Sequence, residues 1–290
     1  MKDNFATVFV RENKVVTKVR ISSDSKPDID ANVIEKWQSI LDLTSSLINI
    51  PAALIMKLNS ENIEVFLRSY NPDNPYHPNE KAELGCGLYC ENVIGTQRTL
   101  IVENAAENHI WNKNNPDIDL NMISYLGFPL NWPDGEVFGT VCILDNKANS
   151  YNDDIENYLH KIKLSLETDL ALICKNQELI RKNQELKSLL TLKNKFLSLI
   201  AHDIRNPLSS FSTILELLTE DFDSISKEEF IEILNSVKLT NSNIQMTLDN
   251  LLDWSKKELI NLQPIISEFD LIDLINNVVK FFKYNLSIKR

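Results

Sequence analysis

The sequence is poor in glycine, has fewer basic than acidic residues and contains no long hydrophobic run. It holds 6 glycines among 290 residues, and its proline content is modest at 10. This composition excludes a fibrous or low-complexity chain. The formal net charge of -11 argues against sequence-independent binding of nucleic acid, because such binding relies on basic side chains that displace counterions. No run of about 18 apolar residues occurs, so we expect no membrane span.

Cysteine is scarce as well. The four thiols are Cys86, Cys90, Cys142 and Cys174, and a few scattered cysteines are typical of a cytoplasmic protein. Cys86 and Cys90 have no second Cys or His pair at ligand spacing, so we expect no metal site. The N-terminus lacks the apolar core and cleavage site of a signal peptide. We therefore expect a cytoplasmic location.

The first half of the chain mixes helical and strand patterns. Residues 1–31 hold two short apolar runs around "RENK", which predict either a hairpin or a loosely held arm. From Asn32 a helical pattern is followed by several short strands. The Asp134-Gly135 pair suits a tight hairpin turn, because glycine accepts a positive φ. A helical pattern returns from Asn152. Helix, antiparallel strands and helix indicate a multidomain chain that starts with an α+β domain.

Two segments within residues 32–172 carry a family resemblance. "GLYCENVIGTQRTLIVENA" and "NPDIDLNMISYLGFPLNWPDGEVFGTVCILD" resemble the GAF domain of bacterial signalling proteins. The resemblance implies a six-stranded antiparallel sheet with helices packed on one face. Related GAF domains often hold a small ligand between sheet and loops, whereas others bind none and serve as dimerisation modules.

The candidate pocket residues of this GAF sensor domain are Tyr89, Cys90, Tyr125 and Cys142, which lie near expected strand ends. On the residues alone, aromatic and cysteine side chains on such strands more often belong to the core. A cyclic nucleotide, haem, a tetrapyrrole, a redox signal and no ligand at all remain open.

A long helical stretch runs from residue 157 to 218, without glycine and with Pro207 as its one proline. Its apolar residues recur at alternating steps of four and three, which is the heptad pattern of a coiled coil. The expected a positions are Asn183, Leu190, Leu197, Ile204, Phe211 and Leu218, and the d positions are Leu179, Leu186, Lys193, Ile200, Pro207 and Ile214. Polar Asn183 and Lys193 leave the register adjustable. Residues 173–195 are thus either a signalling helix or a plain dimer spacer.

This register places His202 at position f, away from the seam. A lone helical histidine is usually a solvated surface residue. However, "FLSLIAHDIRNPLSSFSTILELL" resembles the H-box of the dimerisation and histidine phosphotransfer domain of two-component sensor kinases. The residues that match in type and spacing are Phe196, His202, Asp203, Arg205, Asn206, Pro207 and Leu208. We assign residues 196–262 to this domain.

A second helix should complete that domain. Ser226 and Glu229 form a capping-box pattern at its start. An apolar seam then continues through Phe230, Leu234, Val237, Asn241, Ile244, Leu248 and Leu251, with Asn241 as its one polar position. Pro264 blocks further helix. Two such hairpins form a four-helix bundle in a homodimer.

Each residue of the polar cluster has a separable role. A neutral imidazole is a competent nucleophile toward a phosphoryl group, and Asp203 is well placed to hold its second ring N–H. The resemblance implies that Nε2 of His202 is the phosphoacceptor and that Asn206 positions water for dephosphorylation of the partner regulator. Arg205 belongs to the same cluster. Pro207 is expected to kink the helix.

Residues 263–290 resemble the beginning of the ATP-binding domain of these kinases, with Asp270 as a candidate N-cap. The Asn-bearing helix for magnesium and the Gly-rich ATP lid are absent from the sequence, and no P-loop replaces them. We therefore expect ATP and Mg²⁺ to be bound beyond residue 290, in a natural chain that continues.

The predicted function is that of a sensor histidine kinase: a GAF input controls ATP-dependent autophosphorylation on His202, followed by transfer to an Asp of a response regulator. The alternative is a non-catalytic dimeric GAF adaptor or a phosphorelay protein without its own ATP site. A GAF-regulated phosphodiesterase is excluded, because no His/Asp metal cluster follows the GAF segment.

Overall fold

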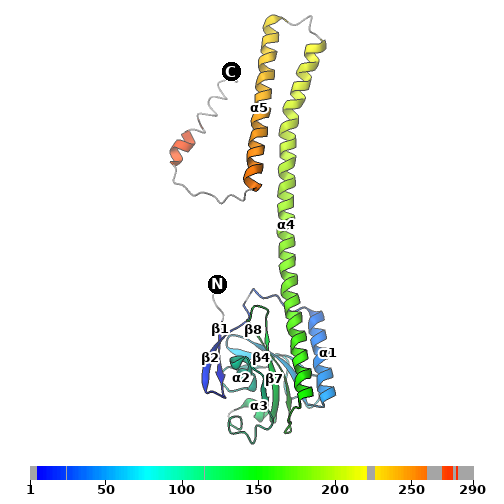
Figure 1. Ribbon diagram of the computed structural model, residues 1–290, viewed down its shortest axis with the longest axis vertical. Coiled ribbons are helices and arrows are strands. Elements are labelled where there is room, and N and C mark those ends of the chain that lie inside the picture. Colours follow the sequence, from blue (N-terminus) through cyan, green and yellow to red (C-terminus); the bar gives the residue numbers. More distant parts are fainter. Residues whose placement is uncertain are drawn as a thin grey trace. The chain divides into compact units, whose positions relative to one another are not determined.

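The computed structural model describes residues 5–23, 25–113, 115–220, 226–259, 270–276 and 279. The chain divides into two compact units, Met1–Lys187 and Ser188–Arg290. The long helix α4 (Asp153–Glu220) contributes to both units (Figure 1). Among the residues with described structure, no helix has the length and apolarity required to cross a membrane.

The first unit is built on an antiparallel sheet of six strands in the order β5-β4-β3-β8-β7-β6. The strands are β3 (Ala52–Leu58), β4 (Asn62–Arg68), β5 (Lys81–Glu83), β6 (Leu100–Val102), β7 (Ser124–Asn131) and β8 (Val137–Asp145). The hairpin predicted at Asp134-Gly135 is confirmed as β7–β8, and β3 and β4 form a second antiparallel hairpin. Gly135 in the second turn has a φ of 82°, which explains why the turn requires glycine.

Both faces of the sheet carry an apolar core. Along β3, Leu54 and Met56 point to one core, whereas Ala53 and Ile55 point to the other, as the two-residue period of a strand dictates. Helices α1 (Ala31–Ile48) and α4 cover the second core. The first core is covered by α2 (Tyr89–Thr96), the short α3 (Pro116–Asp119) and an N-terminal hairpin. The expectation of helices on one face alone is wrong, because two apolar faces must be buried.

Helices α1 and α4 are joined by a buried carboxylate and lie side by side against the sheet (Figure 1). Asp169 of α4 is 9% exposed. It accepts a hydrogen bond of 2.9 Å from the indole N–H of Trp37 and pairs with the ammonium group of Lys36 at 2.8 Å. A buried charge is tolerated only with such partners. These two contacts of Asp169 therefore hold the N-terminal part of α4 against α1.

The N-terminal segment forms a hairpin rather than a loose arm. Strands β1 (Phe5–Val10) and β2 (Val15–Arg20) pair antiparallel. Ala6 and Val8 are fully buried in the core that also contains α2. Arg11 in the turn donates to the carbonyl oxygens of Ile110 and Lys113. The hairpin is thus part of the first unit's core.

In the second unit, α4 is followed by α5 (Lys227–Leu259). The capping box at the start of α5 is confirmed: the Ser226 N–H donates to the Glu229 carboxylate at 2.9 Å, and the Glu229 N–H donates to Ser226 Oγ at 3.2 Å. The predicted cap at Asp270 is also confirmed, since its carboxylate accepts the Ile272 N–H at 2.7 Å. Pro264, expected to block further helix, lies outside the described residues.

From Ile200 on, the half-buried residues of α4 follow the predicted seam. They are Ile200, Ile204, Pro207, Phe211 and Ile214. Before Ile200 the predicted seam residues Leu190, Lys193 and Leu197 are exposed, and Phe196 is half-buried instead. On α5 the half-buried stripe consists of Phe230, Ile233, Val237, Thr240, Ile244, Thr247 and Leu251. It shares Phe230, Val237, Ile244 and Leu251 with the predicted seam, whereas Leu234, Asn241 and Leu248 of that seam are exposed in the single chain. Steps of four and three are typical of helices that pack on one another, and the predicted seam stays a prediction.

Candidate functional site

The first candidate site lies on the exposed face of α4. His202 is exposed, as expected from position f. The side-chain nitrogen of Asn206, four residues later, lies 3.4 Å from each of the two ring nitrogens. The helix itself creates this neighbourhood, since residues four apart share a face. The structure therefore presents an accessible imidazole with an amide group beside it.

The other members of the polar cluster are placed as follows. Arg205 is exposed, and Pro207 is half-buried on the seam side. Helix α4 continues through Pro207, and a kink at this residue stays a prediction. The side chain of Asp203 lies outside the described residues, so its contact with the imidazole also stays a prediction.

The four predicted pocket residues of the first unit come together in its core. Cys90 Sγ lies 3.4 Å from the hydroxyl oxygen of Tyr125 and 3.9 Å from Cys142 Sγ. The Tyr89 and Tyr125 rings have centroids 4.9 Å apart. Contrary to the expectation of strand ends, Tyr89 and Cys90 open helix α2. Burial raises the pKa of the Cys142 thiol, which keeps it protonated and unreactive.

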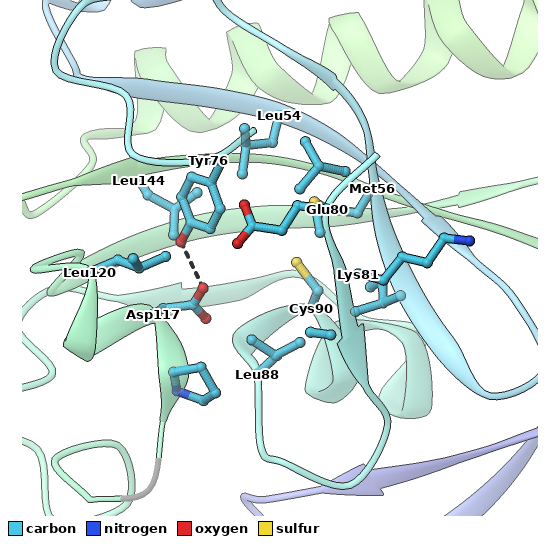
Figure 2. A pocket seen from close by; sticks show the side chains of 14 residues that line it. Leu54, Met56, Tyr76, Glu80, Lys81, Leu88, Cys90, Asp117, Leu120 and Leu144 are labelled. Atoms are coloured by element: carbon cyan, nitrogen blue, oxygen red, sulfur yellow. Dashed lines mark hydrogen bonds between the residues drawn. The ribbon is translucent and has the colours of Figure 1, made fainter. Parts of the chain in front are cut away.

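A cavity of about 90 Å³ opens next to Cys90, the one member of that group among its lining residues. Side chains from the sheet, α2 and α3 surround it (Figure 2). Most of its wall is apolar and is formed by Leu54, Met56, Ile63, Val65, Leu88 and Leu144. The polar groups at the wall belong to Tyr76, Glu80, Lys81 and Asp117. We call this the sheet cavity.

Asp117 is the buried acid of the sheet cavity and is 6% exposed. Its Oδ1 accepts a hydrogen bond of 2.6 Å from the Tyr76 hydroxyl, and its Oδ2 accepts the Tyr89 N–H at 3.4 Å. Burial raises the pKa of this carboxyl group to about 6, against the opposing effect of the Tyr76 hydrogen bond. Burial together with the Asp117 charge raises the pKa of Tyr76 far above its ordinary value.

The pair Tyr76–Asp117 was not predicted from the sequence. The two residues are 41 positions apart, and Tyr76 belongs to no strand or helix. The one available signal is local: Asn115 followed by Pro116 is the typical start of a helix, which places Asp117 in its first turn. Elsewhere, the described residues include no group of three or more His, Cys, Asp or Glu side chains arranged to hold a metal ion.

Asp117→Asn is expected to stabilise the first unit at pH 7 by about 2 kcal/mol. The carboxyl pKa is 3.8 in an unfolded chain and about 6 in the fold. The folded state therefore binds the proton more tightly, and the stability associated with Asp117 is full below pH 3.8 and lost as the pH rises through about 6. Urea unfolding followed by tryptophan fluorescence at pH 4 and pH 7 measures the difference.

The gain from Asp117→Asn should shrink toward zero near pH 4, where the wild-type carboxyl group is already protonated in the fold. Asp119→Asn is the matched control, because Asp119 lies on the same helix and is exposed. It should change the unfolding free energy by less than about 0.5 kcal/mol. A loss of stability at pH 7 in Asp117→Asn would contradict the assignment.

Comparison with known families identifies two domains. Residues 37–162 match the GAF domain. Residues 192–260 match the His Kinase A (phospho-acceptor) domain. The chain therefore combines a GAF domain, with its antiparallel sheet and helices, and a histidine-kinase phosphoacceptor domain that contains His202.

The curated relatives are sensor histidine kinases. The chain is similar to the uncharacterized sensor-like histidine kinase ycf26 of Pyropia yezoensis, with 31% identity over 98 residues, which is 34% of this chain and 14% of the relative. It is also similar to the sensor protein EvgS of Escherichia coli (strain K12), with 30% identity over 103 residues, 36% of this chain and 8% of EvgS. The matches thus span a small part of the relatives' length.

The solved structures similar to this chain include GAF domains. The red light-absorbing state of NpR6012g4, a red/green cyanobacteriochrome, is 13% identical with a TM-score of 0.40, covering 51% of this chain and 99% of that one. The GAF domain from Acinetobacter phosphoenolpyruvate-protein phosphotransferase is 12% identical with a TM-score of 0.39, covering 50% and 85%. Likenesses of this degree carry no information on the ligand.

Proposed function

We propose that this chain is the sensory and phosphoacceptor part of a two-component sensor histidine kinase, in which the GAF domain controls phosphorylation of His202. The observation that carries the proposal is an exposed imidazole within the segment that matches the phosphoacceptor domain. Exposure matters because a separate catalytic domain must bring the phosphoryl group to the ring.

In the proposed reaction, the lone pair of His202 Nε2 attacks the γ-phosphorus of ATP. A P–N bond forms, the P–O bond to ADP breaks, and the proton on Nδ1 stays on the ring. Asp203 holds that Nδ1–H and stabilises the positive charge that develops on the imidazole. The phosphoryl group then moves to an Asp of a response regulator. ATP and Mg²⁺ are bound by a catalytic domain outside residues 1–290.

We further propose that the chain acts as a homodimer with a four-helix bundle. Large apolar side chains on the second unit's helices are exposed in the single chain, and Leu197, Leu208, Ile231, Leu234, Leu239, Met246, Leu248 and Leu252 are 42–59% exposed. A second helical hairpin would bury them, and the hydrophobic effect favours that burial. The exposed position of His202 keeps it outside the bundle core.

Radiolabelled ATP tests the proposal. The complete encoded protein is incubated with the label, and the product is tested for the acid lability that marks a phosphohistidine. If no label appears, residues 1–290 are offered to a phosphorylated donor kinase or receiver. Labelling only in the second assay favours the phosphorelay alternative, and no acid-labile label in either assay overturns the proposal in favour of the dimeric adaptor.

Asn206→Ala is expected to spare phosphorylation of His202 and to reduce dephosphorylation of the partner regulator by roughly tenfold to a hundredfold. The amide group lies beside the imidazole at 3.4 Å, where it can orient a water but cannot act as a nucleophile. Labelling of His202 and loss of label from the regulator are followed in parallel. Equal losses in both reactions would refute the assigned role. Ser209→Ala, at an exposed position on the same helix, is the control.

A further inference from the structure

The sheet cavity holds a buried acid without a cationic partner. Among the described residues, no Lys, Arg or His side chain lies within ion-pair distance of Asp117. Its two hydrogen-bond donors, the Tyr76 hydroxyl and the Tyr89 N–H, are neutral. Arg11 acts on Asp117 only at longer range, because its guanidinium donates to the Ile110 and Lys113 carbonyl oxygens. A buried carboxylate of this kind is costly to the fold.

A second carboxylate lies at the edge of the cavity. Figure 2 shows the Glu80 carboxylate beside the Tyr76 ring, whereas the amino group of Lys81 points away. Glu80 is exposed, and its Oε2 accepts the His77 N–H at 3.0 Å. Lys81 lies 3.7 Å from Glu64 instead. Asp117 is therefore the buried charged group of the cavity, and most of the remaining wall is apolar.

We propose that the sheet cavity binds a small ligand with an apolar body and one protonated amine, whose ammonium group contacts the Asp117 carboxylate. This inference deepens the proposed function, since it names the ligand class of the sensory half. The ammonium supplies the positive charge that the protein does not, and the apolar wall takes up the hydrocarbon.

The size of the cavity restricts the ligand. Its volume of about 90 Å³ lies well below the roughly 300–1,000 Å³ of pockets that hold drug-sized ligands. A tetrapyrrole or a cyclic nucleotide is far larger. A phosphate or a carboxylate group would also face Asp117 and Glu80 and would be repelled. These two arguments favour a short alkylamine over the ligands left open by the sequence.

The site is held in place before a ligand arrives. Arg68 donates from Nη1 to the carbonyl oxygens of Asn74 at 3.1 Å and Tyr76 at 2.6 Å, which fixes the loop that carries the Tyr76 hydroxyl. That hydroxyl in turn orients the Asp117 carboxylate. A preorganised acceptor lowers the cost of ordering upon binding.

Three probes of matched shape test the proposal on the whole chain: isobutylamine, isobutanol and isobutyrate. Isothermal titration calorimetry at pH 7 should show the amine binding at least about tenfold more tightly than the alcohol, and no binding of the acid. Equal binding of amine and alcohol, tighter binding of the acid, or no binding of any probe overturns the proposal. This comparison needs no variant and no kinase activity, so it fails independently of the proposed function.

Asp117→Asn then assigns the contact. The variant should lose at least about tenfold in affinity for isobutylamine and keep its affinity for isobutanol. Asp119→Asn, which removes the same charge from an exposed position on α3, should bind the amine as the wild type does. An equal loss in both variants would show that net charge rather than the buried contact attracts the amine, and would overturn the assignment to the sheet cavity.

Discussion

His202→Gln is expected to lower acid-labile phosphorylation by at least about a hundredfold, because a carboxamide cannot replace the imidazole as a nucleophile. The substitution should abolish phosphorylation without changing the stability of the fold. His202 is exposed on α4, and surface substitutions away from special features change stability by less than about 0.5 kcal/mol. Glutamine also maintains the helix.

Two measurements make this prediction specific. His109 is exposed in a turn of the GAF domain, and His109→Gln should retain full labelling. Light scattering should give the same dimeric mass for the wild type and for His202→Gln, since position f lies outside the seam. A monomeric His202→Gln variant would contradict the heptad register, and residual label on it would move the phosphoacceptor to another residue.

The register of α4 could be predicted because it depends on local periodicity alone. Ile200, Ile204, Pro207 and Phe211 recur at steps of four and three, and a helix places residues at such steps on one face. The α5 stripe could be predicted only at alternate positions. Its helix has apolar residues on two sides, as Ile233 and Leu234 illustrate, and the sequence does not say which side faces its own hairpin and which is left for a partner.

The sheet cavity could not be predicted for a different reason. Tyr76 lies in the loop between β4 and β5, and Asp117 lies in the short helix α3 between β6 and β7. No sequence period links these two segments, and an Asp in a polar stretch is ordinarily a surface residue. Tyr89, Tyr125 and Cys142, which the sequence suggested as pocket residues, are buried in the packed core beside the cavity, and Cys90 alone of that group lines it.

Glu91 is a further residue whose burial could not be predicted from the sequence. A glutamate in a helix is ordinarily exposed, but Glu91 is fully buried in α2. Its Oε2 accepts the N–H groups of Phe9 at 3.2 Å and Gly85 at 2.7 Å. Its Oε1 accepts the N–H groups of Gly87 at 3.0 Å and Leu88 at 3.4 Å. One carboxylate thus joins the N-terminal hairpin, the loop before α2 and α2 itself.

Glu91→Ala is expected to destabilise the GAF domain by about 3–5 kcal/mol. The substitution leaves four backbone N–H groups without their acceptor, those of Gly87 and Leu88 in buried positions, and it removes the link between β1 and α2. Urea unfolding followed by tryptophan fluorescence measures the loss, and Glu107→Ala at an exposed position is the control with no expected change.

Glu91→Gln separates the hydrogen bonds from the volume of the side chain. Glutamine keeps the shape and one acceptor oxygen, so it can serve either Phe9 and Gly85 or Gly87 and Leu88, while its NH₂ group meets the other two donors. We expect an intermediate loss of roughly 1–3 kcal/mol. If Glu91→Gln were as stable as the wild type, the side chain would stabilise the domain mainly through its volume rather than through the charge of its carboxylate. If it were as unstable as Glu91→Ala, the N-terminal hairpin would depend on all four hydrogen bonds acting together.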